Sequence, residues 1–480
     1  MVFLAAASIG ALALAGAPKS VELTVYNANF ALVKEVRSFN LRAGRQEVRV
    51  EDVASYIDPT SVSFKSLTPG SSIDILEQNY QYDLLSTQSI LLKSIGKRVR
   101  LRQQLQNGDV VVTEGILLSA PGQVVSTGAG ASRVYTGMVV ETDDGRYVLN
   151  PTGTVEVLEI PEGLISKPTL MWNLLAGRSG AYDIELAYLT NQIGWSADYV
   201  LTLNEDDTMA DLNGWVTINN KSGATYENAS LKLIAGDVRR VQPRARGGFG
   251  GGRLEMAAAA DLGFAEETLF EYHLYTLQRP ATVRNNETKQ ISLLSASDVA
   301  VEKELIFEGQ RSMWRSRGVS YRPGQGYATD LNVKINVIIV LRNSKENNLG
   351  IPLPKGKVRV YKRDSAGQVQ MLGEDQIDHT SREEKLRLWI GNAFDVVGER
   401  KRLSFRKISN TVVQEAFEIK VRNRKTKSVA VRVIEHGWGD WEILSETMPG
   451  KKLDSNTFEY AITLQPDEEK VITYTIQTRW

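Results

Sequence analysis

The sequence predicts a mainly β protein made of tandem antiparallel β-sandwich domains, with a small inserted β-barrel of the SH3 or OB type. Apolar and polar side chains alternate through many short runs, as at residues 182–188 and 195–201. Because successive side chains of a strand point to opposite faces, this period of two buries one face and exposes the other to water. Residues that favour turns separate the runs, for example at 191–194, 204–207 and 220–223.

The length and composition indicate a globular chain of several domains. The sequence has 480 residues, of which 42% are hydrophobic and 24% charged, and domains usually contain roughly 100–200 residues. Lys and Arg number 57, as do Asp and Glu, so net charge does not indicate a nucleic acid or an anionic membrane as partner. Residues 399–435 are locally basic, with eleven Lys/Arg against four Glu. This window predicts a solvated hairpin face, with a patch for an anionic polymer as the alternative.

The N-terminal residues predict export. Residues 2–17 form an uncharged apolar stretch, and residues 13–15 (Ala-Leu-Ala) and 15–17 (Ala-Gly-Ala) fit the small-x-small pattern of a signal-peptide cleavage site. The stretch is shorter than the ~20 residues of a membrane-spanning helix. No Lys or Arg follows Met1, which departs from the usual basic start. We expect a signal peptide at 1–17, with an uncleaved anchor as the alternative. The mature chain, without a membrane span, is then expected in the periplasm, cell envelope or extracellular space.

The first half of the chain divides into a β region and an insertion. Residues 18–95 predict an N-terminal β region that ends in a short helix at 86–95, for which Ser86 is a suitable N-cap. Residues 96–162 contain five short strand-like runs with tight polar turns, which predict the small barrel. The insertion has few aromatic residues and an acidic segment at 141–144, so we expect no nucleic-acid binding.

The second half predicts two further sandwich regions. Residues 163–290 carry the segment GWSADY in a predicted β-sandwich, and residues 291–480 predict a C-terminal β-sandwich region. The glycine-rich residues 244–253 lack the spacing and the strand-to-helix context of a phosphate-binding loop, so we interpret them as a linker.

The residues with reactive side chains form no recognisable catalytic motif. The chain has no cysteine, which excludes disulfides, thiolate nucleophiles and cysteine-based zinc sites. Its three histidines are far apart in sequence, and we expect no metal and no cofactor. His273 is the most interesting of them, because on a strand it shares a face with Glu271 and Tyr275. Such a face can support general acid–base chemistry, but an ordinary half-buried strand face is the expected interpretation.

Aromatic side chains suggest a possible ligand surface. Tryptophan rings can stack on the apolar faces of sugars. Most tryptophans lie inside alternating strands, where a core role is expected. Trp438 and Trp441, in the polar segment HGWGDW, are better surface candidates, and Tyr321 and Tyr327 bound a second aromatic loop, YRPGQGY. The candidate ligand surface therefore comprises Trp438, Trp441, Tyr321, Tyr327, Glu271 and His273.

Several segments resemble one bacterial family. They include GWSADYVLTL, DLNGWVTINNKSGATYENASLKLIAGD and the closing FEYAITLQPDEEKVITYTIQTRW. From about Val21 to Trp480 the chain resembles the bacterial "domain of unknown function 4139" proteins, relatives of the mucoidy-inhibitor proteins. The resemblance implies an exported, mainly β envelope protein, and it brings no catalytic residues with it. The long central coiled-coil helices of mucoidy-inhibitor relatives are absent from this sequence.

Two functional hypotheses follow. The first is an exported cell-envelope β-sandwich protein that acts as a non-catalytic scaffold or protein-interaction module. The alternative is an envelope glycan-binding protein or glycan-active hydrolase. The expected partners are other envelope proteins or surface glycans, and the sequence leaves the oligomeric state open.

Overall fold

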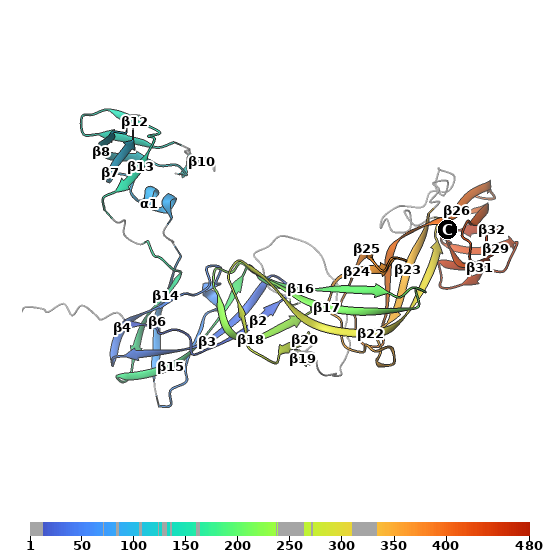
Figure 1. Ribbon diagram of the computed structural model, residues 1–480, viewed down its shortest axis with the longest axis horizontal. Helices are drawn as coiled ribbons and strands as arrows, with labels where there is room; N and C mark the ends of the chain where they lie inside the picture. The colour runs from blue at the N-terminus through green and yellow to red at the C-terminus, as the bar shows by residue number, and fades with distance from the viewer. Residues whose placement is uncertain are drawn as a thin grey trace, which may run out of the picture. The chain divides into compact units, whose positions relative to one another are not determined.

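The computed structural model shows a chain built almost entirely of strands (Figure 1). Strands make up 66% and helices 3% of the described residues, which confirms the predicted mainly β class. The described residues group into two compact units. Unit 1 comprises Met1–Gly194, Asn219–Lys232 and Arg279–Thr288, and unit 2 comprises Trp195–Ile218, Leu233–Gln278 and Lys289–Trp480. The structure describes residues 13–70, 72–82, 86–104, 108–122, 124–126, 132–134, 137–159, 164–236, 238, 264–269, 272–309 and 334–480.

Unit 1 contains two sheets that pack face to face. One sheet includes the antiparallel order β2 (Ser20–Tyr26), β3 (Phe30–Leu41), β15 (Gly180–Asn191) and β5 (Ser63–Ser66). The other has the order β1 (Ala13–Leu14), β4 (Gly44–Glu51), β14 (Thr169–Ala176) and β6 (Ile73–Gln81). Phe64 of the first sheet meets Trp172 of the second edge-to-face, with ring centroids 4.9 Å apart. The alternation predicted at 182–188 is confirmed, because every second residue of that run is buried.

The end of the predicted signal peptide contacts this unit. β1 pairs in parallel with β4, Ala13 opposite Val48 and Leu14 opposite Arg49. The main-chain N–H of Ala15 donates to the carbonyl of Arg49 at 3.0 Å. Cleavage after Ala15 or Ala17 would therefore remove β1 and expose the edge of β4.

The insertion is an open sheet covered by a helix. Its five strands have the order β12 (Tyr147–Leu149), β11 (Val139–Thr142), β8 (Val110–Ser119), β7 (Arg98–Gln104) and β13 (Thr154–Val157). The predicted helix is confirmed as α1 (Thr87–Lys93), capped by the Ser86 hydroxyl, which accepts from the N–H of Ser89 at 2.9 Å. Leu91 and Leu92 pack on the core of the sheet. Over the described residues the strands do not close on themselves, so the predicted barrel is wrong in this respect; the helix covers the inner face that closure would have buried. β9 (Val124–Ser126) and β10 (Ser132–Val134) form a separate pair.

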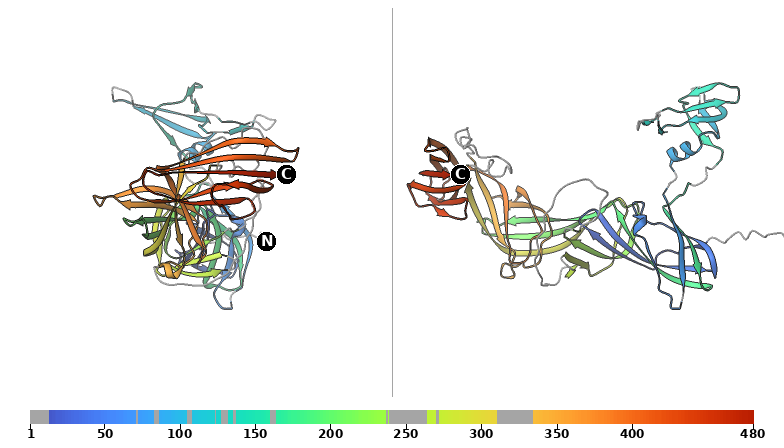
Figure 2. Two further views of the ribbon diagram at one scale, coloured as in Figure 1. Left: turned by 90° about the vertical axis from the view of Figure 1, so that its right-hand side faces the viewer. Right: turned by 180° about the vertical axis from the view of Figure 1, so that it is seen from behind.

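Unit 2 contains one long mixed sheet and a shorter layer packed on its C-terminal part. The sheet path is β25 (Val369–Ile377), β24 (Gly356–Arg363), β16 (Ile193–Leu203), β17 (Met209–Asn220), β22 (Glu287–Phe307), β23 (Lys334–Arg342), β26 (Lys385–Lys407), β27 (Val412–Asn423), β32 (Glu469–Arg479) and β29 (Asp440–Glu446). The shorter layer pairs β28 (Val429–His436) with β31 (Thr457–Leu464), and β30 (Lys451–Lys452) pairs with β31. Figure 2 shows the C-terminal strands, coloured orange and red, in two layers.

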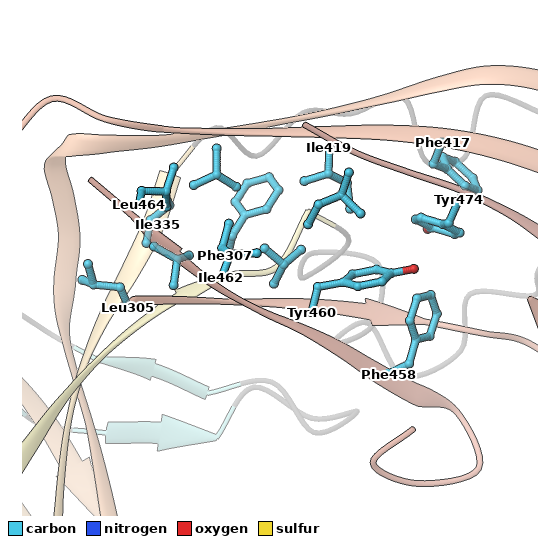
Figure 3. Close-up of a cluster of buried hydrophobic side chains, with 14 of the residues drawn as sticks. Leu305, Phe307, Ile335, Phe417, Ile419, Phe458, Tyr460, Ile462, Leu464 and Tyr474 are labelled. Carbon is cyan, nitrogen blue, oxygen red and sulfur yellow. The ribbon is translucent and has the colours of Figure 1, made fainter. Parts of the chain in front are cut away.

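An aromatic core fills the space between the two layers. Figure 3 shows Phe458, Tyr460 and Tyr474 pointing toward one another from β31 and β32. The Phe458 ring lies edge-to-face with Tyr460 and with Tyr474, at centroid distances of 5.7 and 5.4 Å. Edge-to-face pairs add about 0.5–1.5 kcal/mol to the free energy of burial. The C-terminal region is thus a two-layer sandwich with its own core.

Three buried asparagines repeat one way of closing a sandwich corner. Asn220, Asn343 and Asn423 lie at or directly after a strand end and are each 0% exposed. Their side-chain amides donate to main-chain carbonyls at 2.7–3.4 Å, and their side-chain oxygens each accept from one main-chain N–H at 3.0 Å. Among the carbonyl acceptors are Val283 and Arg284 for Asn220, Ile351 and Ser381 for Asn343, and Leu464 and Gln465 for Asn423.

The chain segment that each asparagine binds also repeats. It turns through a left-handed residue, Asn286, Glu383 or Asp467, with φ of 57°, 65° and 57°. In two of the three corners the next glutamate accepts a main-chain N–H from three residues earlier, as Glu287 does from Arg284 and Glu468 does from Gln465. The three corners therefore share one hydrogen-bonding pattern around a buried asparagine.

Candidate functional site

Unit 2 holds a cavity where two hairpin loops meet. β16 and β24 run parallel, with Ala197 opposite Gly356 and Leu203 opposite Lys362. The loops that follow them, at 204–208 and 364–368, therefore leave the sheet at the same end. The cavity has a volume of about 870 Å³ and is lined by both loops, by the start of β17 and by Asp298 of β22.

Both loops are fixed by their own side chains. The side-chain oxygen of Asn204 accepts from the N–H of Thr208 at 2.9 Å. In the other loop, a carboxylate oxygen of Asp364 accepts from the N–H of Gln368 at 2.9 Å, and the second accepts from the Gln370 side-chain amide at 3.0 Å. The Gln370 hydrogen bond and the main-chain N–H groups hold the pKa of Asp364 below its ordinary value. The rim of the cavity is thus rigid and keeps its carboxylate ionised.

A cluster of charged side chains holds the first loop, residues 204–208, in place. Asp207, in a left-handed conformation with φ of 60°, forms ion pairs with both Lys303 and Lys362. The Lys362 Nζ lies 2.6 Å from the Asp207 carboxylate and donates to the carbonyl of Glu205, also at 2.6 Å. Burial opposes ionisation of Asp207, but the two ammonium groups outweigh it and lower the pKa of the carboxyl.

The cavity lining carries an excess of negative charge. Four carboxylates line it against two cations. Apolar contact area comes from Leu203, Met209 and Leu372. Among the described residues that line the cavity there is no histidine, so its hydroxyl groups have no imidazole base there. The arrangement suits binding of a polar molecule with some apolar surface. The charged lining residues are Glu205, Asp211, Asp298, Asp364, Lys362 and Arg363.

A polar sheet face adjoins the cavity. On β17, Asp211, Asn213, Trp215 and Thr217 alternate with buried residues and point outward. Their neighbours on β16 and β22 form cross-strand pairs with them: the Thr217 hydroxyl donates to Asp198 at 2.7 Å. Further pairs link Gln290 to Thr217 at 3.2 Å and Ser295 to Asn213 at 2.8 Å. We call the residues Asp198, Asn213, Trp215, Thr217, Gln290 and Ser295 the Trp215 face.

The predicted aromatic surface is only partly within the described chain. Trp441 is half-buried and packs against the C-terminal core, with its ring 5.2 Å from that of Phe458. Its indole N–H donates to the carbonyl of Ser455 at 2.7 Å, and the Lys452 ammonium lies 4.6 Å from its ring centroid. Trp438 is half-buried in the same loop. Tyr321 and Tyr327 lie outside the described residues.

His273 binds a carboxylate that the sequence did not single out. Its Nδ1 lies 2.7 Å from Oε1 of Glu266, whose side chain is only 7% exposed. Glu266 comes from β19 (Phe264–Leu269), which pairs with β20 (Tyr272–Leu277), so cross-strand pairing in that hairpin was the signal that could have found it. Glu271 lies outside the described residues. Tyr275 is buried, which raises its pKa, and its hydroxyl donates to the carbonyl of Pro352 at 3.1 Å.

The other two histidines each contact a different part of the protein. His379 Nδ1 accepts from the N–H of Lys355 at 3.2 Å, and His436 Nε2 lies 2.9 Å from Glu308. In the part of the chain that the structure describes, no three His, Asp or Glu residues gather as a possible metal site. Within the same residues, no helix has the length and hydropathy needed to cross a membrane.

A buried arginine, glutamate and tyrosine form a network in the C-terminal core. Arg400 and Glu435 have side chains 2% and 0% exposed, and the Arg400 Nε donates to both Glu435 oxygens at 3.1 and 2.9 Å. Tyr474 accepts from Arg400 at 3.1 Å and donates to Glu435. The guanidinium also lies 3.9 Å from the Phe417 ring centroid. Burial opposes the charge of Arg400, but Glu435 outweighs it and raises the pKa of the guanidinium.

Unit 1 contains a second network of the same composition. Arg37 Nε donates to Glu35 at 2.7 Å, and both side chains are 4% exposed. The Tyr188 hydroxyl donates to the other Glu35 oxygen at 3.2 Å. Both networks neutralise their charges inside a core, and in each a tyrosine hydroxyl from another strand donates to the glutamate.

The basic window at 399–435 is largely paired. Arg432 contacts Glu459 at 2.8 Å and Glu304 at 3.1 Å, and Arg422 lies 3.4 Å from Glu399. These pairs favour the predicted solvated hairpin face, because much of the positive charge is compensated by carboxylates.

The fold and site define a class: a multi-sheet β protein with repeated sandwich corners and a negatively charged cavity between two hairpin loops. The model of the family described as Domain of unknown function (DUF4139) matches residues 184–480, and the chain belongs to this family. A search of curated proteins finds no match. The family resemblance is thus confirmed for the part of the chain that holds the cavity, and residues before Ile184 lie outside the match.

Proposed function

We propose that the protein is an exported, non-catalytic scaffold or protein-interaction module of the cell envelope. The apolar N-terminal stretch at 2–17 motivates export. The observation that carries the interaction role is β6 (Ile73–Gln81), a nine-residue strand at the end of the order β1-β4-β14-β6.

β6 has the properties of a strand that accepts a partner strand. Among the described strands it pairs only with β14, so its other edge presents main-chain N–H and C=O groups. Its apolar side chains are exposed, Ile75 by 37% and Leu76 by 50%, and Tyr82 directly beyond it by 71%. An extended segment of another protein can add to such an edge through main-chain hydrogen bonds. A bulge at Leu76 interrupts pairing with β14, which leaves 77–81 as the regular portion.

In-cell photo-cross-linking tests this role. A photoreactive amino acid at Leu76 is expected to give a discrete adduct with one or a few envelope proteins in intact cells. The matched control is Leu175, which is 42% exposed but lies on β14, where it pairs with Arg45 of β4 on one side and with Asp74 of β6 on the other. We expect no adduct there, because both edges of that strand are occupied. Absence of an adduct at Leu76, or the same adducts from both positions, would contradict the proposal.

A further inference from the structure

We propose that the Trp215 face and the cavity beside it bind a neutral oligosaccharide, with the Trp215 indole as the stacking platform. This goes beyond a role in protein interaction. Sugars combine an apolar ring face with many hydroxyl groups, so they are recognised by an exposed aromatic ring set among hydrogen-bonding side chains. The face and cavity lie within unit 2 and offer both elements.

Trp215 offers an exposed aromatic ring. It is 40% exposed in the middle of β17, which corrects the expectation that tryptophans inside alternating strands are core residues. Its indole N–H donates to no described residue. By contrast, four other tryptophans donate this N–H to a protein oxygen: Trp172, Trp195, Trp389 and Trp441. Trp215 therefore has both a free ring surface and a free donor for a ligand.

The side chains around Trp215 are held in place before any ligand arrives. Thr217 lies two residues further along the same outward face, and its hydroxyl links Asp198 to Gln290. On the other side, Asn213 is bound by Ser295. Amides, hydroxyls and one carboxylate offer donors and acceptors in fixed positions. Pre-ordering reduces the entropy lost when a ligand binds.

The face leads into the cavity. Asp211 lines the cavity and lies four residues before Trp215 on the same outward side of β17. At roughly 3.3 Å per residue this separates the two by about 13 Å. A single sugar ring does not cover this length, so the site fits a short chain with one ring on Trp215 and another in the cavity.

Charge selects against an acidic sugar. Four carboxylates face two cations in the cavity lining, and the ammonium of Lys362 is already paired with Asp207. A uronate would meet repulsion there, whereas a neutral or N-acetylated sugar would meet hydrogen-bond acceptors for its hydroxyl groups.

Calorimetric titration of the full chain tests the site. The probes are cellohexaose and the hexasaccharide of N-acetylglucosamine as neutral ligands, and hexagalacturonate as the acidic one. We expect the wild type to bind at least one neutral probe and to bind the acidic probe at least about tenfold more weakly. Trp215→Ala should weaken neutral binding by about tenfold, the loss of one stacking contact. Asn213→Ala should weaken it by about threefold, the loss of one modest hydrogen bond.

Trp389→Ala is the matched control. Trp389 is also 40% exposed, but its indole N–H is bound by the carbonyl of Gly391. Trp389→Ala should leave the affinity for the neutral probes within about twofold of the wild-type value, a change well below the loss of one stacking contact. Circular dichroism and the urea midpoint of each variant verify folding. Failure of both neutral probes to bind at millimolar concentration, wild-type affinity in Trp215→Ala, equal loss in Trp389→Ala, or tighter binding of hexagalacturonate would each overturn the proposal.

Discussion

Glu435→Ala is expected to lower the free energy of unfolding of the C-terminal sandwich by about 3–5 kcal/mol, the usual cost of leaving one member of a buried ion pair alone. The variant leaves the Arg400 guanidinium, which is 2% exposed, in the core without its partner carboxylate. Tyr474 loses the acceptor of its hydroxyl at the same time. Urea denaturation followed by tryptophan fluorescence measures the change as a lower midpoint.

Glu418→Ala is the matched control for this variant. Glu418 pairs with Lys420 at 3.3 Å, but its side chain is 24% exposed and that of Lys420 is 33% exposed. Pairs in contact with water contribute about 0–1 kcal/mol, so the midpoint should move little. If Glu435→Ala shifted the midpoint no more than Glu418→Ala, the network would not hold the core as described.

Asn423→Ala is expected to lower the free energy of unfolding by about 3 kcal/mol, because it leaves several buried main-chain groups without partners. The Asn423 amide donates to the carbonyls of Lys427, Leu464 and Gln465, and its oxygen accepts from the N–H of Lys425. Alanine removes all four contacts from a position that is 0% exposed. Chemical denaturation monitors the loss, as for Glu435→Ala.

Asn423→Asp separates the donor role from the acceptor role. It keeps the oxygen that binds Lys425 but replaces the donating amide with a carboxylate facing carbonyl groups. We expect it to destabilise at least as much as alanine, because like-charged oxygens then face each other. Because the corner is repeated, Asn220→Ala and Asn343→Ala should have comparable costs. If Asn423→Asp left the free energy of unfolding unchanged, the amide donors would not be the groups that close the corner.

The alternation of apolar side chains was sufficient to predict the fold class, and it also held information on the buried networks. Glu435 is in phase with Val431 and Val433, and all three are buried. Glu35 and Arg37 are likewise in phase with Val33 and Phe39. A charged residue in the apolar phase of a strand was therefore the signal for a buried pair. The partner could not be named from sequence, because Arg400 and Tyr474 lie on other strands.

The site depends on contacts between distant segments, which local pattern does not contain. The cavity forms because β16 pairs in parallel with β24, about 160 residues later in the chain. Closure of the insertion was predicted from strand number, but α1 covers the inner face over the described residues. The outward position of Trp215 follows from its phase on β17, opposite to that of Leu212 and Val216. A tryptophan is usually buried, but the position of Trp215 in the alternation of β17 places its side chain on the exposed face.

The most direct test of an exported envelope protein is the N-terminal residue of the protein recovered from cells. Mass spectrometry of protein released from the envelope fraction should find a chain that begins at Gly16 or Pro18, with the β1 pairing to β4 removed. Recovery of the protein from the cytosol with Met1 intact would contradict export and with it the proposed role.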